Sequence, residues 1–280
     1  MSREDQVIPN ARRHGKRWKA NREHWSRTLD AQNLSEGVAE IPLDAQVALF
    51  ETFDVRCALS EMRPLRGRMT LDLGGGLGLM AILLAARGAT VVVADISLPR
   101  LKRAREIITR EGLQASIHFV CTTAEDLAFR DKSFDRITCK SVLIHTDLAR
   151  ASAELARTLA RDGMSCLIEP MARNPFVNLY RRIAAPKIWR EITDYFTPRS
   201  IETVARPFRE RGFSTRTRYT FWLAFFASPL NYSLHWPRAY RGMENFLNWI
   251  DGMLFKLFPA IRRQCWFCII VVQRKGEGRG

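Results

Sequence analysis

The stretch Met69-Thr-Leu-Asp-Leu-Gly-Gly-Gly-Leu-Gly78 decides the fold of this chain. Its first five residues are mostly apolar and predict a short buried strand, and the glycines that follow predict a tight turn. Residues 79–87 then predict a helix, which Gly88 closes. A glycine turn between a strand and a helix lets the backbone approach a ligand closely. The N-terminus of such a helix also favours a negatively charged or electron-rich group.

An acidic residue follows the turn at the sequence distance expected of a carboxylate that binds a ribose. Asp95 lies seventeen residues beyond Gly78, at the end of the apolar stretch 90–95, which predicts a second strand. A carboxylate at this point can accept hydrogen bonds from both hydroxyls of a ribose. The turn and Asp95 together predict a nucleoside-ligand site at the carboxyl ends of parallel strands. The alternative is a tight turn beside a solvated aspartate.

Two kinds of nucleoside cofactor fit this pattern. The run Gly76-Leu-Gly78-Leu-Met-Ala81 satisfies the loose dinucleotide fingerprint, so NAD or FAD is one alternative. Asp72 favours another kind of ligand, because a carboxylate in the turn would repel a pyrophosphate but suits a cationic ammonium or sulfonium.

Strands and helices alternate over the next hundred residues. This alternation predicts an α/β fold with a doubly wound parallel sheet and right-handed crossovers. We also expect one helix over 43–62 before the first strand, and a looser arrangement beyond Pro170. The further predicted strands are 116–120, 134–140, 164–169, a strand from Phe213 and 265–273, and the further helices are 99–111, 147–160, 176–193 and 198–211.

Four more motifs accompany the turn and Asp95. They are Ala124-Glu-Asp-Leu-Ala-Phe129, Ser133-Phe-Asp135, Val142-Leu-Ile-His145 and Glu169-Pro170. With them, residues 66–175 resemble the class I S-adenosylmethionine-dependent methyltransferases, specifically the broad small-molecule group. The resemblance implies a Rossmann-like methyltransferase fold with a mostly parallel seven-stranded sheet and a helical, aromatic-rich C-terminal insertion. A weaker match continues at Tyr195-Phe-Thr-Pro198 and Gly212-Phe213.

The resemblance also implies S-adenosylmethionine as the cofactor and a role for each residue that would bind it. Gly74, Gly76 and Gly78 would surround the methionine moiety, and Asp72 would bind its ammonium directly or through water. The residues implied at the nucleoside are Asp95 on the ribose hydroxyls, Ile96 against the adenine, and Ala124 and Glu125 along the adenine edge. Two positions depart from the family pattern. Thr123 stands where an aspartate is common, and Lys140 stands where a small polar residue is common.

Methyl transfer from a sulfonium is an in-line displacement, so a general base is needed only when the nucleophile arrives protonated. His145 is the candidate base, because it follows the fourth strand; the alternative is a histidine that packs or caps at a helix start. Glu169 is a candidate for binding the acceptor, or it caps the carboxyl edge of the sheet. No cluster with metal-ligand spacing is seen, so no metal is predicted.

The basic charge of the chain lies at its two ends. The 280 residues carry 44 Lys and Arg against 29 Asp and Glu, a net charge of +15. Residues 1–30 have a net charge of +4, residues 181–280 have +11, and the residues between them are balanced. Such an excess suits a nucleic acid or an anionic membrane, or it reflects heavy use of arginine. The composition is otherwise that of a globular protein, which excludes collagen-like and wholly disordered chains.

Half of the 28 aromatic residues lie between Tyr219 and Phe267. The first interpretation is core plus a pocket for an apolar acceptor, the second is contact with an anionic membrane surface, and stacking on nucleic acid comes last. The last is not expected, since the Asn/Asp-Pro-Pro-aromatic signature of amino-methylating nucleic-acid enzymes is absent after the fourth strand.

The six cysteines do not suggest a disulfide framework. Cys265 and Cys268 should lie on opposite faces of one strand, which argues against a shared metal or a redox pair. The N-terminus has no apolar signal region, and the longest uncharged stretch, 219–237, is interrupted by prolines. We therefore expect a cytoplasmic protein, with membrane association as the alternative.

Three segments are predicted along the chain. They are a basic N-terminal arm at 1–40, an S-adenosylmethionine-binding domain at 41–175, and substrate-side helices with the final strands at 176–280. The function predicted is methyl transfer to a small-molecule or lipid-like acceptor held by the aromatic C-terminal region. An NAD(P)-dependent oxidoreductase and a non-catalytic binding protein are the alternatives.

Overall fold

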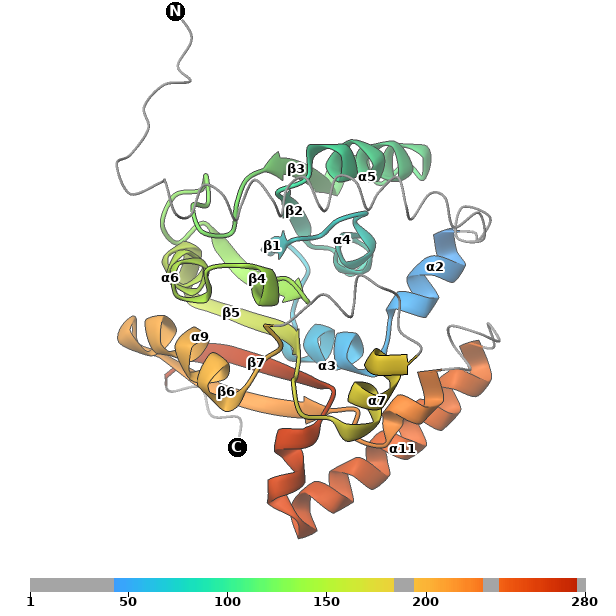
Figure 1. The fold of residues 1–280 in the computed structure, drawn as a ribbon. Helices are drawn as coiled ribbons and strands as arrows, with labels where there is room; N and C mark the ends of the chain where they lie inside the picture. The colour runs from blue at the N-terminus through green and yellow to red at the C-terminus, as the bar shows by residue number, and fades with distance from the viewer. Residues whose placement is uncertain (1–42, 184–193, 229–236, 276–280) are drawn as a thin grey trace, which may run out of the picture.

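The structure is a computed structural model that describes residues 43–183, 194–228 and 237–275 (Figure 1). The predicted arm at 1–40 and the second half of the predicted helix 176–193 lie outside the described residues.

The described residues form one seven-stranded sheet with the strand order β3-β2-β1-β4-β5-β7-β6. The first five strands pair in parallel, and β7 lies antiparallel between β5 and β6. This confirms the predicted doubly wound, mostly parallel α/β fold. The strands are β1 (Met69–Leu73), β2 (Thr90–Asp95), β3 (Ile117–Cys121), β4 (Phe134–Lys140), β5 (Leu159–Pro170), β6 (Phe213–Thr220) and β7 (Phe267–Arg274).

Helices cover both faces of this sheet. One buried cluster packs α3, α4 and α5 on one face, and another packs α6 and α9 on the opposite face. Each crossover returns the chain to the next parallel strand, so the segments after β1, β2, β3 and β4 all emerge at one edge. The helices are α2 (Leu43–Phe50), α3 (Phe53–Glu61), α4 (Leu79–Ala85), α5 (Leu98–Arg110), α6 (Leu148–Thr158) and α9 (Pro198–Glu210).

The prediction of one helix over 43–62 is wrong. The helix is interrupted at Thr52, whose backbone is extended (φ −65°, ψ 167°), and a second helix, α3, begins at Phe53. The N–H of Phe53 donates to Oε1 of Glu244 at 2.9 Å. Because the first N–H groups of a helix have no partner within it, this acceptor, 191 residues away, stabilises the break.

The C-terminal helices gather at one end of the molecule (Figure 1). Here Phe221 and Trp266 form a small buried cluster with Val177 and Ala224. Among the described residues, no helix combines the length and the apolar character that a membrane crossing requires. The elements at this end are α7 (Pro175–Ile183), the 3-10 helix η3 (Ala224–Ala227), α11 (Pro237–Leu257) and the 3-10 helix η4 (Pro259–Gln264).

The expected separation of the two late cysteines is also wrong. Strand β7 begins at Phe267, so Cys265 precedes it and strand alternation does not apply. Cys265 and Cys268 are both buried free thiols in the same core cluster. Burial raises the pKa of both thiols, which keeps them protonated and unreactive.

Candidate functional site

The glycine turn joins β1 to α4 and has a backbone that side chains would not allow. Gly74 has φ +64°, and a Cβ on it would lie 2.3 Å from Cγ2 of Val142. Gly76 has φ +53°, and a Cβ on it would lie 3.1 Å from Nη2 of Arg100. Glycine is required at position 74, because L-residues avoid positive φ and real Cβ atoms do not approach other atoms so closely. At position 76 a side chain would be strained by the positive φ and would press on the flexible end of Arg100. The turn is therefore enclosed by the segments that follow β4 and β2.

Asp95 holds the turn from its side. Its Oδ2 accepts the N–H of Gly76 at 3.0 Å, and its Oδ1 accepts the N–H of Ser97 at 2.8 Å. The side chain is 7% exposed, at the carboxyl end of β2. Each carboxylate oxygen can accept a second hydrogen bond, so the hydroxyls of a ribose remain acceptable partners. Ile96, the next residue, is half-buried.

Asp72 supplies the test of whether a cationic ligand fits. Its side chain is buried, and its Oδ2 makes no hydrogen bond. Burial, and then the negative charge of Asp95, raise the pKa of Asp72 to about 8. A buried carboxylate with an unsatisfied oxygen costs free energy, and an ammonium or sulfonium beside it would remove that cost. The residues present therefore fit a ligand that combines a positive charge with a ribose.

The segment after β3 completes the nucleoside side. The N–H of Thr122 donates to the backbone oxygen of Asp95 at 3.1 Å, which places this segment beside Asp95. Ala124 is buried, and Thr123 pairs with Asp126 in an isolated bridge. Oε1 of Glu125 accepts the N–H of Asp147 at 2.9 Å, so this carboxylate holds the start of α6.

A single family match decides how this site is classified. Residues 71–167 match the family model described as a methyltransferase domain. The chain carries a methyltransferase domain. The matched range includes the glycine turn, Asp95 and the segments after β3 and β4. The match agrees with the predicted family and with S-adenosylmethionine as the cofactor, and it does not favour the oxidoreductase alternative.

Known proteins resemble this methyltransferase domain over a limited range. The ubiquinone/menaquinone biosynthesis C-methyltransferase UbiE of Xanthomonas campestris is 36% identical over 116 residues, which cover 40% of this chain and 45% of that protein. The ubiquinone biosynthesis O-methyltransferase of Psychrobacter arcticus is 27% identical over 149 residues, which cover 50% and 58%. The chain thus spans about half the length of the curated relatives it matches.

A solved structure extends the likeness of fold beyond the matched domain. Geranyl diphosphate C-methyltransferase from Streptomyces coelicolor superposes with a TM-score of 0.54 at 11% identity, covering 79% of this chain and 78% of the other. At this identity the likeness shows the fold alone.

The segment after β4 lies against the glycine turn, because Val142 is the residue that a Cβ on Gly74 would strike. Ser141 has φ +58°, and the next three residues point their N–H groups at Glu169. Oε1 of Glu169 accepts from Val142 at 3.1 Å and from Leu143 at 2.9 Å, while Oε2 accepts from Ile144 at 3.4 Å. Burial raises the pKa of Glu169 to about 7, although these N–H groups favour its charged form.

Glu169 is fully buried, so its place in the structure corresponds to the capping interpretation rather than to acceptor binding. His145 ends the short 3-10 helix η2 (Leu143–His145) and is half-buried. Glu169 accepts the N–H of Val142, and Val142 lies against Gly74. The segment that Glu169 holds therefore borders the glycine turn and leads directly to His145.

Lys140 lies in a polar cluster that the sequence did not indicate. Its Nζ lies 2.6 Å from Oδ2 of Asp54 and 3.0 Å from Oγ1 of Thr52. It also lies 5.5 Å from the ring centroid of Phe50 and 5.2 Å from that of Phe267. Asp54 is fully buried, so the ion pair is shielded from water. The sequence contains Thr52 and Asp54 two residues apart, but it indicated neither the helix start at Phe53 nor the lysine 86 residues away.

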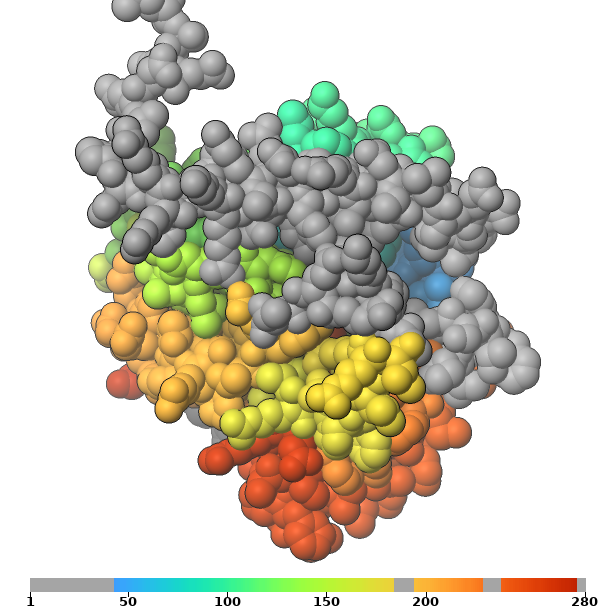
Figure 2. Space-filling model, viewed as in Figure 1, coloured from blue at the N-terminus to red at the C-terminus, as the bar shows by residue number. Residues whose placement is uncertain are grey.

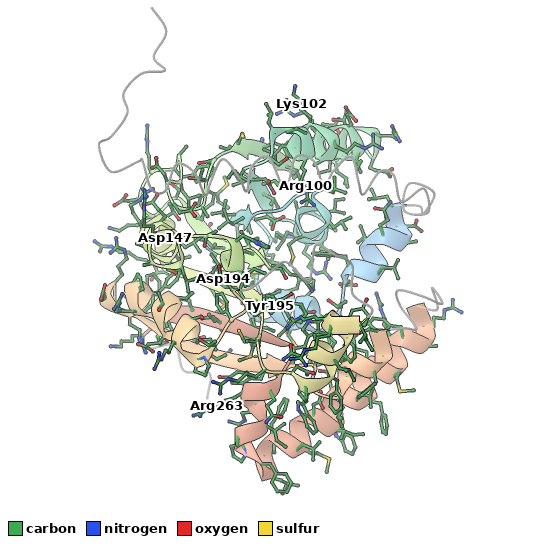
Figure 3. The ribbon with its side chains drawn as sticks, in the orientation of Figure 1. Arg100, Lys102, Asp147, Asp194, Tyr195 and Arg263 are labelled. Carbon is green, nitrogen blue, oxygen red and sulfur yellow. The ribbon has the colours of Figure 1, made fainter. Side chains whose placement is uncertain are left out.

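Beyond β5, a second cation lies at the same edge. The guanidinium carbon of Arg181 lies 3.5 Å from the ring centroid of Tyr195, and its Nη1 donates to the backbone oxygen of Met171. Burial lowers the pKa of Arg181 and raises the pKa of Tyr195. Arg100, Asp147 and Tyr195, labelled in Figure 3, come from the segments that follow β2, β4 and β5.

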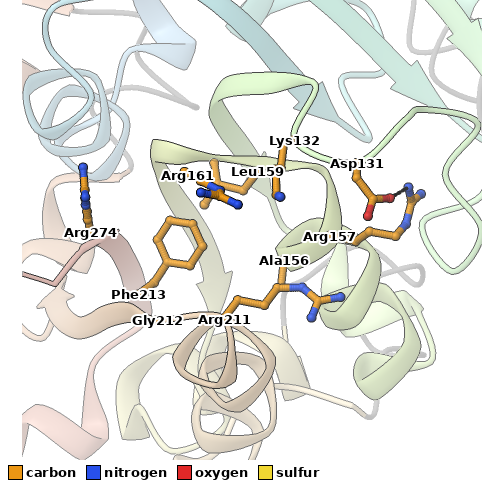
Figure 4. A pocket seen from close by; sticks show the side chains of 10 residues that line it. All are labelled: Asp131, Lys132, Ala156, Arg157, Leu159, Arg161, Arg211, Gly212, Phe213 and Arg274. Atoms are coloured by element: carbon orange, nitrogen blue, oxygen red, sulfur yellow. Dashed lines mark hydrogen bonds and ion pairs between the residues drawn. The ribbon is translucent and has the colours of Figure 1, made fainter.

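A basic pocket of about 550 Å³ lies away from this site (Figure 4). Lys132 precedes β4 and Gly212 precedes β6, so the pocket opens at the amino ends of the parallel strands, opposite the glycine turn. Two of its arginines are already paired, Arg157 with Asp131 and Glu154, and Arg274 with Asp162. The pocket is not part of the candidate site at the glycine turn.

Proposed function

We propose that this chain is an S-adenosylmethionine-dependent methyltransferase that acts on a small, largely apolar acceptor. The observation that carries the proposal is the buried, unsatisfied carboxylate oxygen of Asp72, next to a glycine turn and across from Asp95. A cation with a ribose suits both carboxyl groups, whereas the pyrophosphate of NAD would bring further negative charge beside Asp72 and Asp95. When bound, the cofactor supplies a methyl group on a sulfonium, ready for in-line displacement.

The residues divide into those that bind the cofactor and those that position the binding segments. Asp72 binds the ammonium and Asp95 the ribose hydroxyls, while the glycines admit the methionine moiety. Ile96 and Ala124 flank the adenine. Glu125 and Glu169 act as positioning residues, because their oxygens accept backbone N–H groups of the segments that border the site.

The acceptor side is bordered by aromatic rings. Phe50 and Phe267 flank Lys140, whose charge is neutralised by Asp54. An apolar acceptor with a polar reacting group suits such surroundings. The names of the relatives, which refer to ubiquinone, menaquinone and geranyl diphosphate, are consistent with a quinone-like or isoprenoid acceptor. His145 is the proposed general base for an acceptor that arrives protonated.

Isothermal titration calorimetry with S-adenosylmethionine and with NADH tests the proposal. We expect the wild type to bind S-adenosylmethionine alone, and Asp95→Ala to bind it about tenfold or more weakly, since hydrogen bonds to a charged group are lost. Asp162→Ala is the control, because Asp162 is an exposed partner of Arg274. Binding of NADH without S-adenosylmethionine would overturn the proposal.

A second measurement separates an enzyme from a binding protein. Transfer of a labelled methyl group to quinol-type and isoprenoid acceptors is measured for the wild type and for His145→Ala. We expect the variant to keep its affinity for S-adenosylmethionine and to lose about 10²-fold in kcat, with the loss greatest at low pH. Cofactor binding with no transfer to any acceptor of these classes would favour the non-catalytic alternative.

A further inference from the structure

Helix α11 buries polar side chains and exposes large apolar ones. Its buried face carries Glu244, Asn248 and Asp251, which are 0%, 7% and 1% exposed, between the buried aromatic residues Tyr240 and Phe255. The opposite face exposes large apolar residues that lie three or four positions apart, a spacing that keeps side chains on one face. We call this face the α11 ridge; its members are Met243, Phe246, Trp249, Met253 and Leu257.

Polar contacts fix the helix in this orientation. Glu244 accepts the N–H of Phe53 at 2.9 Å and pairs with Arg56 at 2.8 Å. Asp251 accepts the N–H groups of residues 222, 223 and 224 at 2.8 to 3.3 Å. Rotating α11 to bury the ridge would leave both carboxylates without these partners, so the outward rings are the native arrangement.

The exposed apolar area is large for one helix. Trp249 is 62% exposed and Leu257 is 68% exposed, and the rings of Phe246 and Trp249 stack at 6.3 Å. Phe258, just beyond the helix, is also exposed. The helix extends about 30 Å at 1.5 Å per residue, and it forms the outer boundary of the molecule in Figures 1 and 2. Contiguous apolar patches of this kind mark interaction sites.

The exposed charges on residues 237–264 have one sign. Within residues 237–264, both acidic side chains, Glu244 and Asp251, are buried and hydrogen-bonded to the protein. At 3.6 residues per turn, Arg238 and Lys256 lie about 80° from the centre of the ridge, on the side of Trp249. The exposed basic residues of this range are Arg238, Arg241, Lys256, Arg262 and Arg263, the last labelled in Figure 3. Arg241 pairs at 3.1 Å with Glu51, which directly follows α2, so the basic character of this surface rests on the other four.

We propose that the α11 ridge and its flanking basic residues bind the surface of an anionic lipid bilayer. Phe, Trp, Leu and Met side chains enter the boundary between headgroups and acyl chains, while arginine and lysine contact the phosphates. The helix lies in the plane of the surface, with its polar face kept on the protein. This surface goes beyond the proposed methyl transfer, because binding to lipid requires neither cofactor nor acceptor.

A second copy of the chain is the competing occupant of the ridge. A two-fold pairing of α11 would bring the same flanking cations toward one another, with no exposed acidic residue on 237–264 to neutralise them. An anionic surface neutralises them directly. The charge distribution therefore favours lipid.

Vesicle sedimentation tests the proposal on the full chain. We expect sedimentation with phosphatidylcholine vesicles that contain about 30 mol% phosphatidylglycerol at low salt, and at least tenfold weaker binding to phosphatidylcholine alone or at about 0.5 M salt. The double variant Phe246→Ser with Trp249→Ser should lose at least tenfold in binding, whereas Leu98→Ser, which changes an exposed leucine on α5, should not.

A charge pair of variants separates this surface from basic residues elsewhere. Arg238→Glu with Lys256→Glu should abolish binding, while Arg161→Glu with Arg211→Glu, at the basic pocket of Figure 4, should leave it. Circular dichroism and S-adenosylmethionine affinity, both expected to be unchanged, show that the variants fold. Equal binding by the ridge variants, or a dimer in light scattering that these substitutions dissociate, would overturn the proposal.

Discussion

Asp72 is the residue whose chemistry changes most when a cationic ligand binds. Without ligand its pKa is about 8, so at pH 7 the carboxyl group is mostly protonated. A bound ammonium favours the charged form, so the proton must leave when the ligand binds. We predict release of about one proton for each S-adenosylmethionine bound at pH 7. Calorimetry in buffers of different ionisation enthalpy measures this number.

Asp72→Asn is the matched variant for this measurement. It keeps the shape of the side chain and removes the titration, so proton release should fall close to zero and affinity should fall about tenfold. Equal proton release by the variant would show that another group titrates.

Gly74 and Gly112 allow backbone strain to be separated from steric conflict. Both have positive φ, +64° and +69°, but a Cβ at Gly74 would strike Val142 whereas Gly112 has open space around it. We predict that Gly74→Ala loses S-adenosylmethionine binding by about 10²-fold or more, and that Gly112→Ala costs about 1 kcal/mol of stability and leaves binding intact. Calorimetry measures the binding of S-adenosylmethionine, and thermal unfolding measures the stability of each variant. Equal binding by both variants would mean that the turn adapts.

The residues proposed to bind the cofactor could be named from the sequence because the chemistry of the ligand lies in short motifs. Asp72, the glycines and Asp95 lie within 24 residues, on two adjacent strands. Asp54 and the positioning role of Glu169 depend on partners far away in sequence, Lys140 and the segment 142–144, which no local pattern identifies. The roles predicted for His145 and Glu125 stay predictions.

At the level of the helices, the buried carboxylate of Asp251 should contribute to the free energy of unfolding. It is the acceptor for the first N–H groups of the segment that leads into η3. We predict that Asp251→Ala lowers the free energy of unfolding by about 1–3 kcal/mol, because buried N–H groups lose their acceptor. Met253→Ala, on the exposed face of the same helix, should change it by less than about 0.5 kcal/mol. Urea unfolding gives both values, and similar losses would contradict the orientation of α11.

The same helix shows where the prediction of elements from sequence reaches its limit. Apolar residues at a spacing of three and four normally predict the buried face. In α11 an apolar stripe of this kind is exposed, because the buried face combines Tyr240 and Phe255 with polar residues that bond to α3 and to the segment before η3. Strands β1, β2 and β4, by contrast, were correct to the residue, since they are continuous and bounded by turns. The break at Thr52 was missed because its acceptor, Glu244, lies on α11.

For the molecule as a whole, Asp72 and Glu169 make stability depend on pH. Their pKa values in the folded chain, about 8 and about 7, lie above the ordinary 3.8 and 4.5. At pH values between the ordinary pKa and the raised pKa of each group, the folded chain binds more protons than the unfolded chain. The free energy of unfolding therefore falls as the pH rises. The contribution is fully present below about pH 4 and is lost as the pH passes through 7 and 8.

We therefore predict that ligand-free wild type loses stability relative to Asp72→Asn between pH 5.5 and pH 8.5. The difference between the two proteins removes the effect of the general net charge of +15. Urea midpoints at several pH values measure it, and saturating S-adenosylmethionine should reduce the slope. Parallel curves for the two proteins would contradict the elevated pKa of Asp72.

The position of β7 has a consequence for how the protein is made. This strand is the last of the sheet in chain order, yet it lies between β5 and β6. A nascent chain emerging from the ribosome can pair β1 to β5 early, but β6 finds no neighbour until residues 267–274 have also emerged. Until then the edge of β5 is open and β6 is unpaired, which is the state in which chains associate wrongly. Chaperone contact is therefore expected to concentrate on the interval between the synthesis of β6 and that of β7.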